Sequence, residues 1–137
     1  MSDGHAQDAL IQLMLAAAAA DGAISDKELR EVDELISFLP VFEGFDRDHL
    51  PAIADQNAKM LSADDGIDAI VENLIAKVPT RLYETAYALA VEVISADVRA
   101  SQAELRLLEI LRDAFDMDRL TAGAIEHSAR VRYRRLN

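Results

Sequence analysis

The sequence contains no cysteine and no tryptophan, and it is poor in glycine, proline and aromatic residues. Without cysteine the chain forms no disulfide bond and no thiolate metal site. Five glycines and three prolines in 137 residues supply too little turn chemistry for a fold of many short strands. Only 5% of the residues are aromatic while 51% are hydrophobic, a balance typical of helices that pack through aliphatic side chains. The composition therefore predicts an all-α protein.

The chain also lacks a hydrophobic run long enough to span a bilayer, since residues 13–20 form one of its longest apolar stretches. No Lys or Arg precedes Lys27, so the first residues do not resemble a secretory signal. The length fits one domain, residues 1–137, with room for a hydrophobic core. We expect a single soluble, cytoplasmic domain with no direct membrane insertion.

Basic residues are scarce, and the formal net charge of −11 disfavours nucleic acid and anionic lipid as partners. Cations, basic peptides and other proteins are the expected partners. The C-terminal end is an exception, because it carries Arg130, Arg132, Arg134 and Arg135. These arginines form either a basic docking surface or a cationic complement to the negative end of a last helix.

Helical periodicity and capping residues predict about seven helices. Six of them have the approximate ranges 6–20, 26–39, 46–57, 79–96, 102–114 and 118–134. The remaining one, fourth in the chain, opens at Ser62 or Asp65 and ends before Pro79. The fifth is apolar on nearly all sides between Ala86 and Ile94, so we expect it to be buried.

A pattern at the start of the second helix recurs 76 positions later. Asp21, Ser25, Glu28, Leu29 and Arg30 recur as Asp97, Ser101, Glu104, Leu105 and Arg106. The recurrence predicts a duplicated helix pair, residues 10–39 and 86–115. Gly22 supplies a left-handed stop between the first two helices, and a Ser/Glu capping box opens each second helix.

The duplicated corners suggest a divalent metal site. An EF-hand is excluded, because its first and third ligand positions would be Ala17 and Ala19. Carboxylates without nearby His or Cys instead form a hard oxygen set suited to Ca²⁺, Mg²⁺ or Mn²⁺. If the corners face each other, four carboxylates could share one cation: Asp21, Glu28, Asp97 and Glu104.

A purely structural interpretation competes with this metal site. Glu28 and Glu104 can each simply complete the capping box of their own helix, although capping does not account for the repeat of Asp21 as Asp97. In the second corner Val98 replaces the glycine and Arg99 brings a cation beside Asp97, so the first corner is the better candidate.

Other polar residues give weaker signals. Glu92, on the buried fifth helix, is either a further ligand, a proton-responsive acid, or the partner of an arginine. Tyr83 and Tyr87 favour packing at the core edge over a stacking platform. The three histidines (His5, His49 and His127) show no ligand spacing, and no nucleophile elbow, phosphate loop or triad is present, so no enzyme activity is expected.

The segment 15–29, Leu-Ala-Ala-Ala-Ala-Ala-Asp-Gly-Ala-Ile-Ser-Asp-Lys-Glu-Leu, resembles the TerB family of tellurite-resistance proteins, and so does its echo in residues 88–105. The resemblance implies a seven-helix bundle in which the duplicated helix pairs have a pseudo-twofold organisation. It implies a role in bacterial stress responses to tellurite, other chemical insults and phage. It also implies divalent metal binding by Asp21, Glu28, Asp97 and Glu104. Family members are expected to act through protein complexes, including membrane-associated partners. The alternative is a structural adaptor that docks a partner through its basic last helix.

Overall fold

The computed structural model describes residues 3–20, 22, 24–96 and 100–136. Within these ranges the chain forms seven α-helices, three short 3-10 helices and no β-strand, which confirms the predicted all-α bundle. The α-helices are α1 (Asp3–Ala19), α2 (Asp26–Phe38), α3 (Leu50–Leu61), α4 (Gly66–Lys77), α5 (Tyr83–Ser95), α6 (Gln102–Ala114) and α7 (Arg119–Arg132). The 3-10 helices are η1 (Pro40–Phe42), η2 (Arg47–His49) and η3 (Thr80–Leu82).

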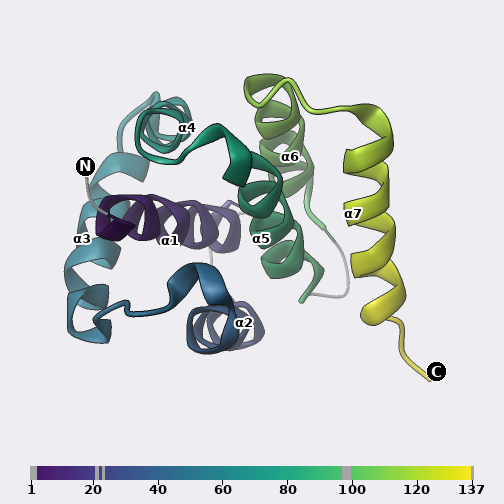
Figure 1. Cartoon of the computed structure of the whole chain (residues 1–137), viewed down its shortest axis with the longest axis horizontal. Coiled ribbons are helices and arrows are strands. Elements are labelled where there is room, and N and C mark those ends of the chain that lie inside the picture. The colour runs from purple at the N-terminus through teal and green to yellow at the C-terminus, as the bar shows by residue number, and fades with distance from the viewer. Residues whose placement is uncertain (1–2, 21, 23, 97–99, 137) are drawn as a thin grey trace.

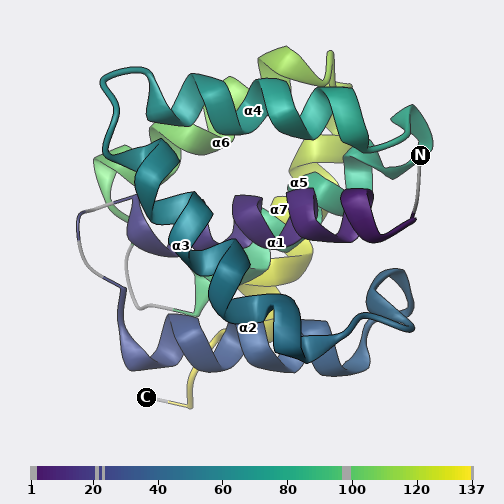
Figure 2. The ribbon, with the colours of Figure 1, turned by 90° about the vertical axis from the view of Figure 1, so that its left-hand side faces the viewer.

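Helix α1 lies at the centre of the molecule and packs against α2, α3, α4 and α5 (Figure 1). After a 90° turn, α4 and α2 run along opposite sides of α1, and α3 crosses between them (Figure 2). Every residue from Ala9 to Ala18 is buried. The alanines in this stretch have little bulk, so neighbouring helices can approach closely.

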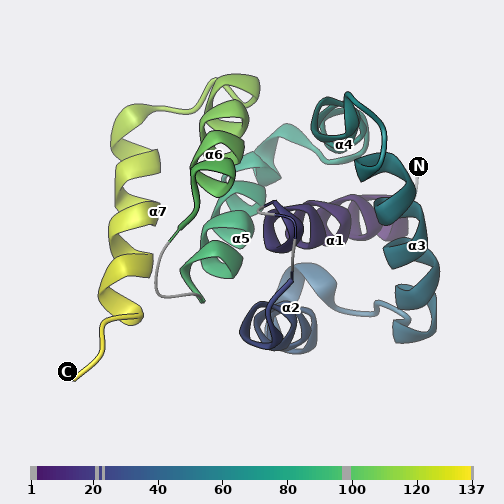
Figure 3. The same ribbon diagram turned by 180° about the vertical axis from the view of Figure 1, so that it is seen from behind.

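Helix α5 joins this cluster to the C-terminal helices. Viewed from behind, α5 lies between α1 on one side and α6 and α7 on the other (Figure 3). Its inward-facing residues are buried, as predicted: Ala86, Tyr87, Leu89, Ala90, Val91, Val93 and Ile94. Within the described residues, no helix has the length and apolar character needed to cross a membrane.

The predicted helix stops agree with the structure. Gly22 follows α1 with a φ of 95°, a left-handed conformation that glycine adopts without strain. Helix α6 ends in a Schellman motif, in which Asp116 has a φ of 48° and the Met117 N–H donates to the Arg112 carbonyl at 3.0 Å. Helices α2 and α6 begin at Asp26 and Gln102, the predicted starts.

The prediction for the third helix was wrong in its boundaries. Asp46 does not start an α-helix; its carboxylate accepts the Asp48 N–H at 3.0 Å and caps the short η2. Helix α3 begins at Leu50 because Pro51 fits the first helical turn, where its missing N–H is not needed. It then continues to Leu61, past the predicted end.

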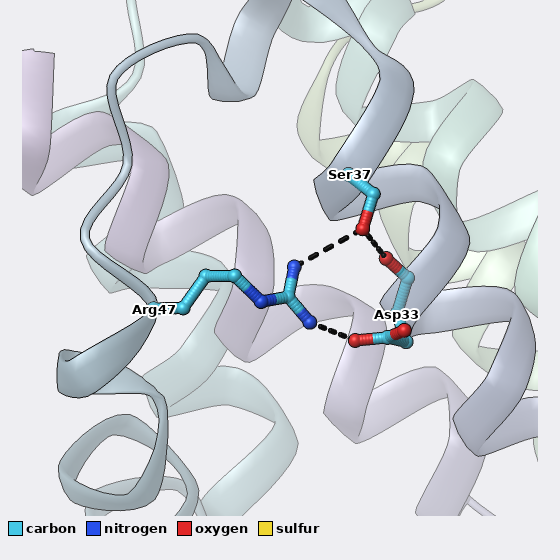
Figure 4. A network of polar contacts seen from close by, with 3 residues as sticks. All are labelled: Asp33, Ser37 and Arg47. Atoms are coloured by element: carbon cyan, nitrogen blue, oxygen red, sulfur yellow. Dashed lines mark hydrogen bonds and ion pairs between the residues drawn. The ribbon is translucent and has the colours of Figure 1, made fainter.

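The segment between α2 and α3 is tied back to α2 by one polar network. The Arg47 guanidinium on η2 pairs with the Asp33 carboxylate and donates to the Ser37 hydroxyl at 3.2 Å (Figure 4). The Ser37 hydroxyl in turn donates to the Asp33 carbonyl at 2.9 Å. Phe42 on η1 is buried beneath this segment, so the connection is part of the core.

Candidate functional site

The first corner forms the predicted capping box. The Glu28 N–H donates to the Ser25 hydroxyl at 3.1 Å, and the Ser25 N–H donates to Oε1 of Glu28 at 3.0 Å. Two N–H groups that the helix itself cannot satisfy are thereby bonded.

The second corner repeats this geometry. The Glu104 N–H donates to the Ser101 hydroxyl at 3.1 Å, and the Ser101 N–H donates to Oε1 of Glu104 at 2.7 Å. The sequence recurrence is therefore a structural recurrence at both helix starts, and the capping role of both glutamates is confirmed.

Both glutamates are far more buried than capping requires. Glu28 is 0% exposed and Glu104 is 1% exposed. A carboxylate placed away from water costs free energy unless its oxygens are bonded or its charge is compensated. One hydrogen bond and the positive end of the helix dipole provide part of this compensation.

The second oxygen of Glu104 carries the strongest hint of a ligand. Oε2 of Glu104 is buried, and among the described residues it has no hydrogen-bond partner. Such an oxygen can be satisfied by a cation, an ordered water molecule or a proton on the carboxyl group itself. A cation, unlike a water molecule, would also compensate the charge of the carboxylate.

The complete four-carboxylate site cannot be traced in the structure, because Asp21 and Asp97 lie outside the described residues, as do Val98 and Arg99. In the described part of the chain, no three His, Cys, Asp or Glu side chains converge as a metal site would require. A calcium ion takes about six to eight oxygen ligands, more than two glutamates with one capping oxygen each provide. The described residues therefore form no complete donor set by themselves, and aspartates, backbone carbonyls or water would have to join the two glutamates.

Glu92 is the partner of an arginine, the third of the interpretations open from sequence. Its carboxylate forms an ion pair with Arg132 and accepts the Tyr133 hydroxyl at 3.1 Å. Burial raises the pKa of the Tyr133 phenol, and the nearby Glu31 carboxylate raises it further. These contacts fasten the end of α7 to α5, so Glu92 has a structural role.

Sequence reasoning missed a partly buried polar network on α5, α6 and α7. Tyr87, which is 0% exposed, donates its hydroxyl hydrogen to the Glu126 carboxylate. The Arg112 guanidinium donates to the Tyr87 oxygen at 2.9 Å and to Glu126 at 3.1 Å. Burial and the hydrogen bond to Glu126 together raise the pKa of Tyr87 to about 12. The only available signal was Arg112 on the otherwise apolar face of α6.

The remaining aromatic residues and the histidines behave as predicted. Tyr83 stacks on Phe115 with ring centroids 4.7 Å apart, and its hydroxyl lies near the Ile75 carbonyl, so it packs at the core edge. The side chains of the three histidines are exposed and lie on separate elements.

Beside this network, α5, α6 and α7 enclose a groove with a volume of about 900 Å³. Its walls carry arginines, and its floor is formed by apolar residues of α5 and α6. The groove begins near the N-terminal end of α6 and extends to the Tyr87 network, where Arg112 and Glu126 line it.

Comparison of the chain with models of known protein families, with curated proteins and with solved structures finds no match.

Proposed function

We propose that this chain is a TerB-like, non-enzymatic protein of the bacterial cytoplasm that serves in tellurite resistance or a related stress response. In this proposal it binds a divalent cation, Ca²⁺, Mg²⁺ or Mn²⁺, through its duplicated corners. The bound state acts as a protein-interaction module whose partners include members of a membrane-associated complex.

The observation that carries the proposal is the buried carboxylate of Glu104. Its Oε1 is used for capping, while its Oε2 is buried with no hydrogen-bond partner among the described residues. Glu28 at the matching corner is buried to the same extent. A cation at these carboxylates would offset the cost of burying them.

The proposed ligands are Glu28 and Glu104, with Asp21 and Asp97 completing the set. A bound divalent cation supplies positive charge at the start of α2 and α6. In this proposal the packing that keeps both glutamates buried also holds their carboxylates at the ion, so a bound ion favours that packing. Metal binding would thereby stabilise one arrangement of the two helix pairs and alter the surface offered to a partner.

Calorimetric titration with Ca²⁺, Mg²⁺ and Mn²⁺ tests the proposal. We expect the wild-type protein to bind at least one of them, and Glu28→Gln and Glu104→Gln to weaken binding by more than about tenfold. Glutamine still accepts the serine N–H, so both variants should fold and keep their helix starts. Glu72→Gln, at an exposed site on α4, removes the same charge and should bind as the wild type does.

Two results would contradict the metal site. One is the absence of binding by the wild-type protein for all three cations. The other is unchanged affinity in both Glu28→Gln and Glu104→Gln, which would leave the glutamates with a capping role alone.

A second candidate function, a structural adaptor that docks its partner through the basic C-terminal helix, is favoured by the unpaired arginines there. Among the described residues, Arg130, Arg134 and Arg135 have neither an ion pair nor a hydrogen bond from their side chains, whereas Arg132 is paired with Glu92. In this alternative the corner carboxylates only cap helices, and added metal should not change the melting temperature.

A further inference from the structure

The groove between α5, α6 and α7 is elongated and follows two helices. On α6 its lining residues run from Gln102 to Arg112 at helical spacing, a length of about 15 Å. On α7 they include Glu126 and Arg130, one turn apart, and the lining continues with Tyr133, Arg134 and Arg135 just past the end of the helix. A groove with two helical walls and a helical floor has the shape that a fourth helix of a bundle would fill.

The floor of this groove is apolar. It includes Val91 and Ile94 of α5 and Leu105 and Leu108 of α6. Leu105 is 47% exposed, so part of this apolar surface remains open to solvent. Covering it with another apolar side chain would release water and stabilise a complex.

The walls of the groove carry an excess of positive charge. Five arginines and two glutamates line it, and both glutamates are already engaged: Glu109 with Arg106, and Glu126 with Arg112. The remaining wall arginines have no ion-pair partner among the described residues. They are Arg130, Arg134 and Arg135.

This local charge is opposite to that of the whole chain, which is −11. A nucleic acid carries a phosphate at every nucleotide and would meet the repulsion of the acidic body along its length, whereas a short helix can place a few carboxylates at the groove alone. A partner segment with a narrow apolar face and flanking carboxylates matches both the floor and the walls. An amphipathic helix presents such a surface, and helices commonly bind their partners in apolar grooves.

We propose that this groove binds an acidic amphipathic helix of a partner protein. Its apolar side chains contact Leu105 and Ile94, and its carboxylates pair with Arg130 and Arg134. The inference rests on the proposed role as a protein-interaction module and names the surface and the partner chemistry. It does not depend on metal binding, because no residue of the groove belongs to the proposed metal site.

The test uses a fluorescein-labelled peptide of about four helical turns, with leucines on one face and glutamates beside them. Fluorescence anisotropy with the full-length protein is measured in the presence of EDTA, so a failure of the metal proposal does not affect the result. We expect the wild-type protein to bind this peptide at least about tenfold more tightly than a scrambled peptide of the same composition, with affinity falling as salt is added.

Charge-matched variants locate the site. Arg130→Gln/Arg134→Gln should weaken binding by about tenfold or more, because both lost cations face the groove. Arg81→Gln/Arg119→Gln removes the same charge at exposed positions outside the groove and should leave binding unchanged. Leu105→Ser should also weaken binding, whereas Leu29→Ser, with its matching position on α2 and 46% exposure, should not.

Four results would overturn the proposal. The first is a wild-type protein that binds neither peptide, and the second is an equal loss of affinity in both double arginine variants. The third is capture by anionic phosphatidylglycerol vesicles without binding of the peptide, which would assign the arginines to a lipid surface. The fourth is a dimer in sedimentation experiments that Arg130→Gln/Arg134→Gln dissociates, which would make a second copy of this chain the occupant.

Discussion

The two duplicated helix pairs, each taken with the helix that follows it, differ at three matching positions, which are apolar in the first half and polar in the second. In the first pair and the helix that follows it, the positions hold Ile11, Ile36 and Leu50, all of which belong to or pack against the hydrophobic core. At the same offset of 76 the second pair and its following helix have the Tyr87, Arg112 and Glu126 network. The first three side chains are stabilised by burial of apolar surface, whereas the second three are joined by mutual hydrogen bonds.

This difference accounts for part of the basic lining of the groove in the second half. An isoleucine at position 36 packs into the core, but an arginine at position 112 keeps its charged end at the edge, where it lines the groove. The next helix is also attached differently. Asp33 of α2 bonds across to Arg47, while the matching Glu109 of α6 bonds to Arg106 on its own helix and leaves the space between α6 and α7 open.

The largest expected effect comes from the core positions at which the two halves agree. Leu13 and Leu89 correspond at the same offset, and their exposures are 0% and 1%. Leu13→Ala and Leu89→Ala should each lower the free energy of unfolding by about 2–5 kcal/mol, since each leaves a cavity among packed helices. Urea denaturation measures the loss, and Leu29→Ala at an exposed site should change it by less than about 0.5 kcal/mol. A loss at only one leucine would break the equivalence of the two cores.

A smaller loss of stability is expected at alkaline pH, where the Tyr87 phenol of the polar network ionises. The pKa of Tyr87 is about 12 when folded and 10.0 when unfolded, so the unfolded state releases this proton first. The stabilisation is complete below pH 10 and is lost as pH rises toward 12, by about 2–3 kcal/mol.

The measurement compares urea unfolding of the wild type with that of Tyr87→Phe across this range. The phenylalanine variant should lose less stability at alkaline pH, because it has no phenol at this position to ionise. Tyr83→Phe serves as a control that keeps the network. Identical pH profiles for Tyr87→Phe and the wild type would show that the network does not hold the proton.

The smallest expected loss of stability comes from removing a capping hydroxyl, and it should be the same in both halves. Ser25→Ala and Ser101→Ala each remove a hydroxyl that accepts an N–H at 3.1 Å, and each should cost about 1 kcal/mol of stability. Ser25→Thr and Ser101→Thr keep the acceptor and should cost less. Thermal denaturation of the four variants is sufficient, and a clear inequality between the two alanine variants would show that the corners differ despite their shared geometry.

Much of the fold was predictable because its signals are local. The starts of α2 and α6 follow from a serine and a glutamate three residues apart, and the stop after α1 follows from one glycine. The start of α3 was missed because Asp46 and Pro51 compete as helix signals, and the proline determined where the α-helix begins.

The candidate sites were predictable only in part. The pattern identified Glu28 and Glu104, but not that both would be almost completely buried. It identified the C-terminal arginines but not their different roles. Arg132 pairs with Glu92, whereas Arg130 lines the groove. Burial and pairing depend on which helices meet, and helical periodicity does not specify that.

The sequence by itself determined the all-α class and the capping boxes, since these follow from residues within a few positions of one another. It also revealed the duplication, because the same local pattern is repeated 76 positions later. Only the tertiary structure decided the groove and the Tyr87 network. Tyr87 meets Arg112 and Glu126 across 25 and 39 residues of chain, and such contacts exist only after α5, α6 and α7 have packed together.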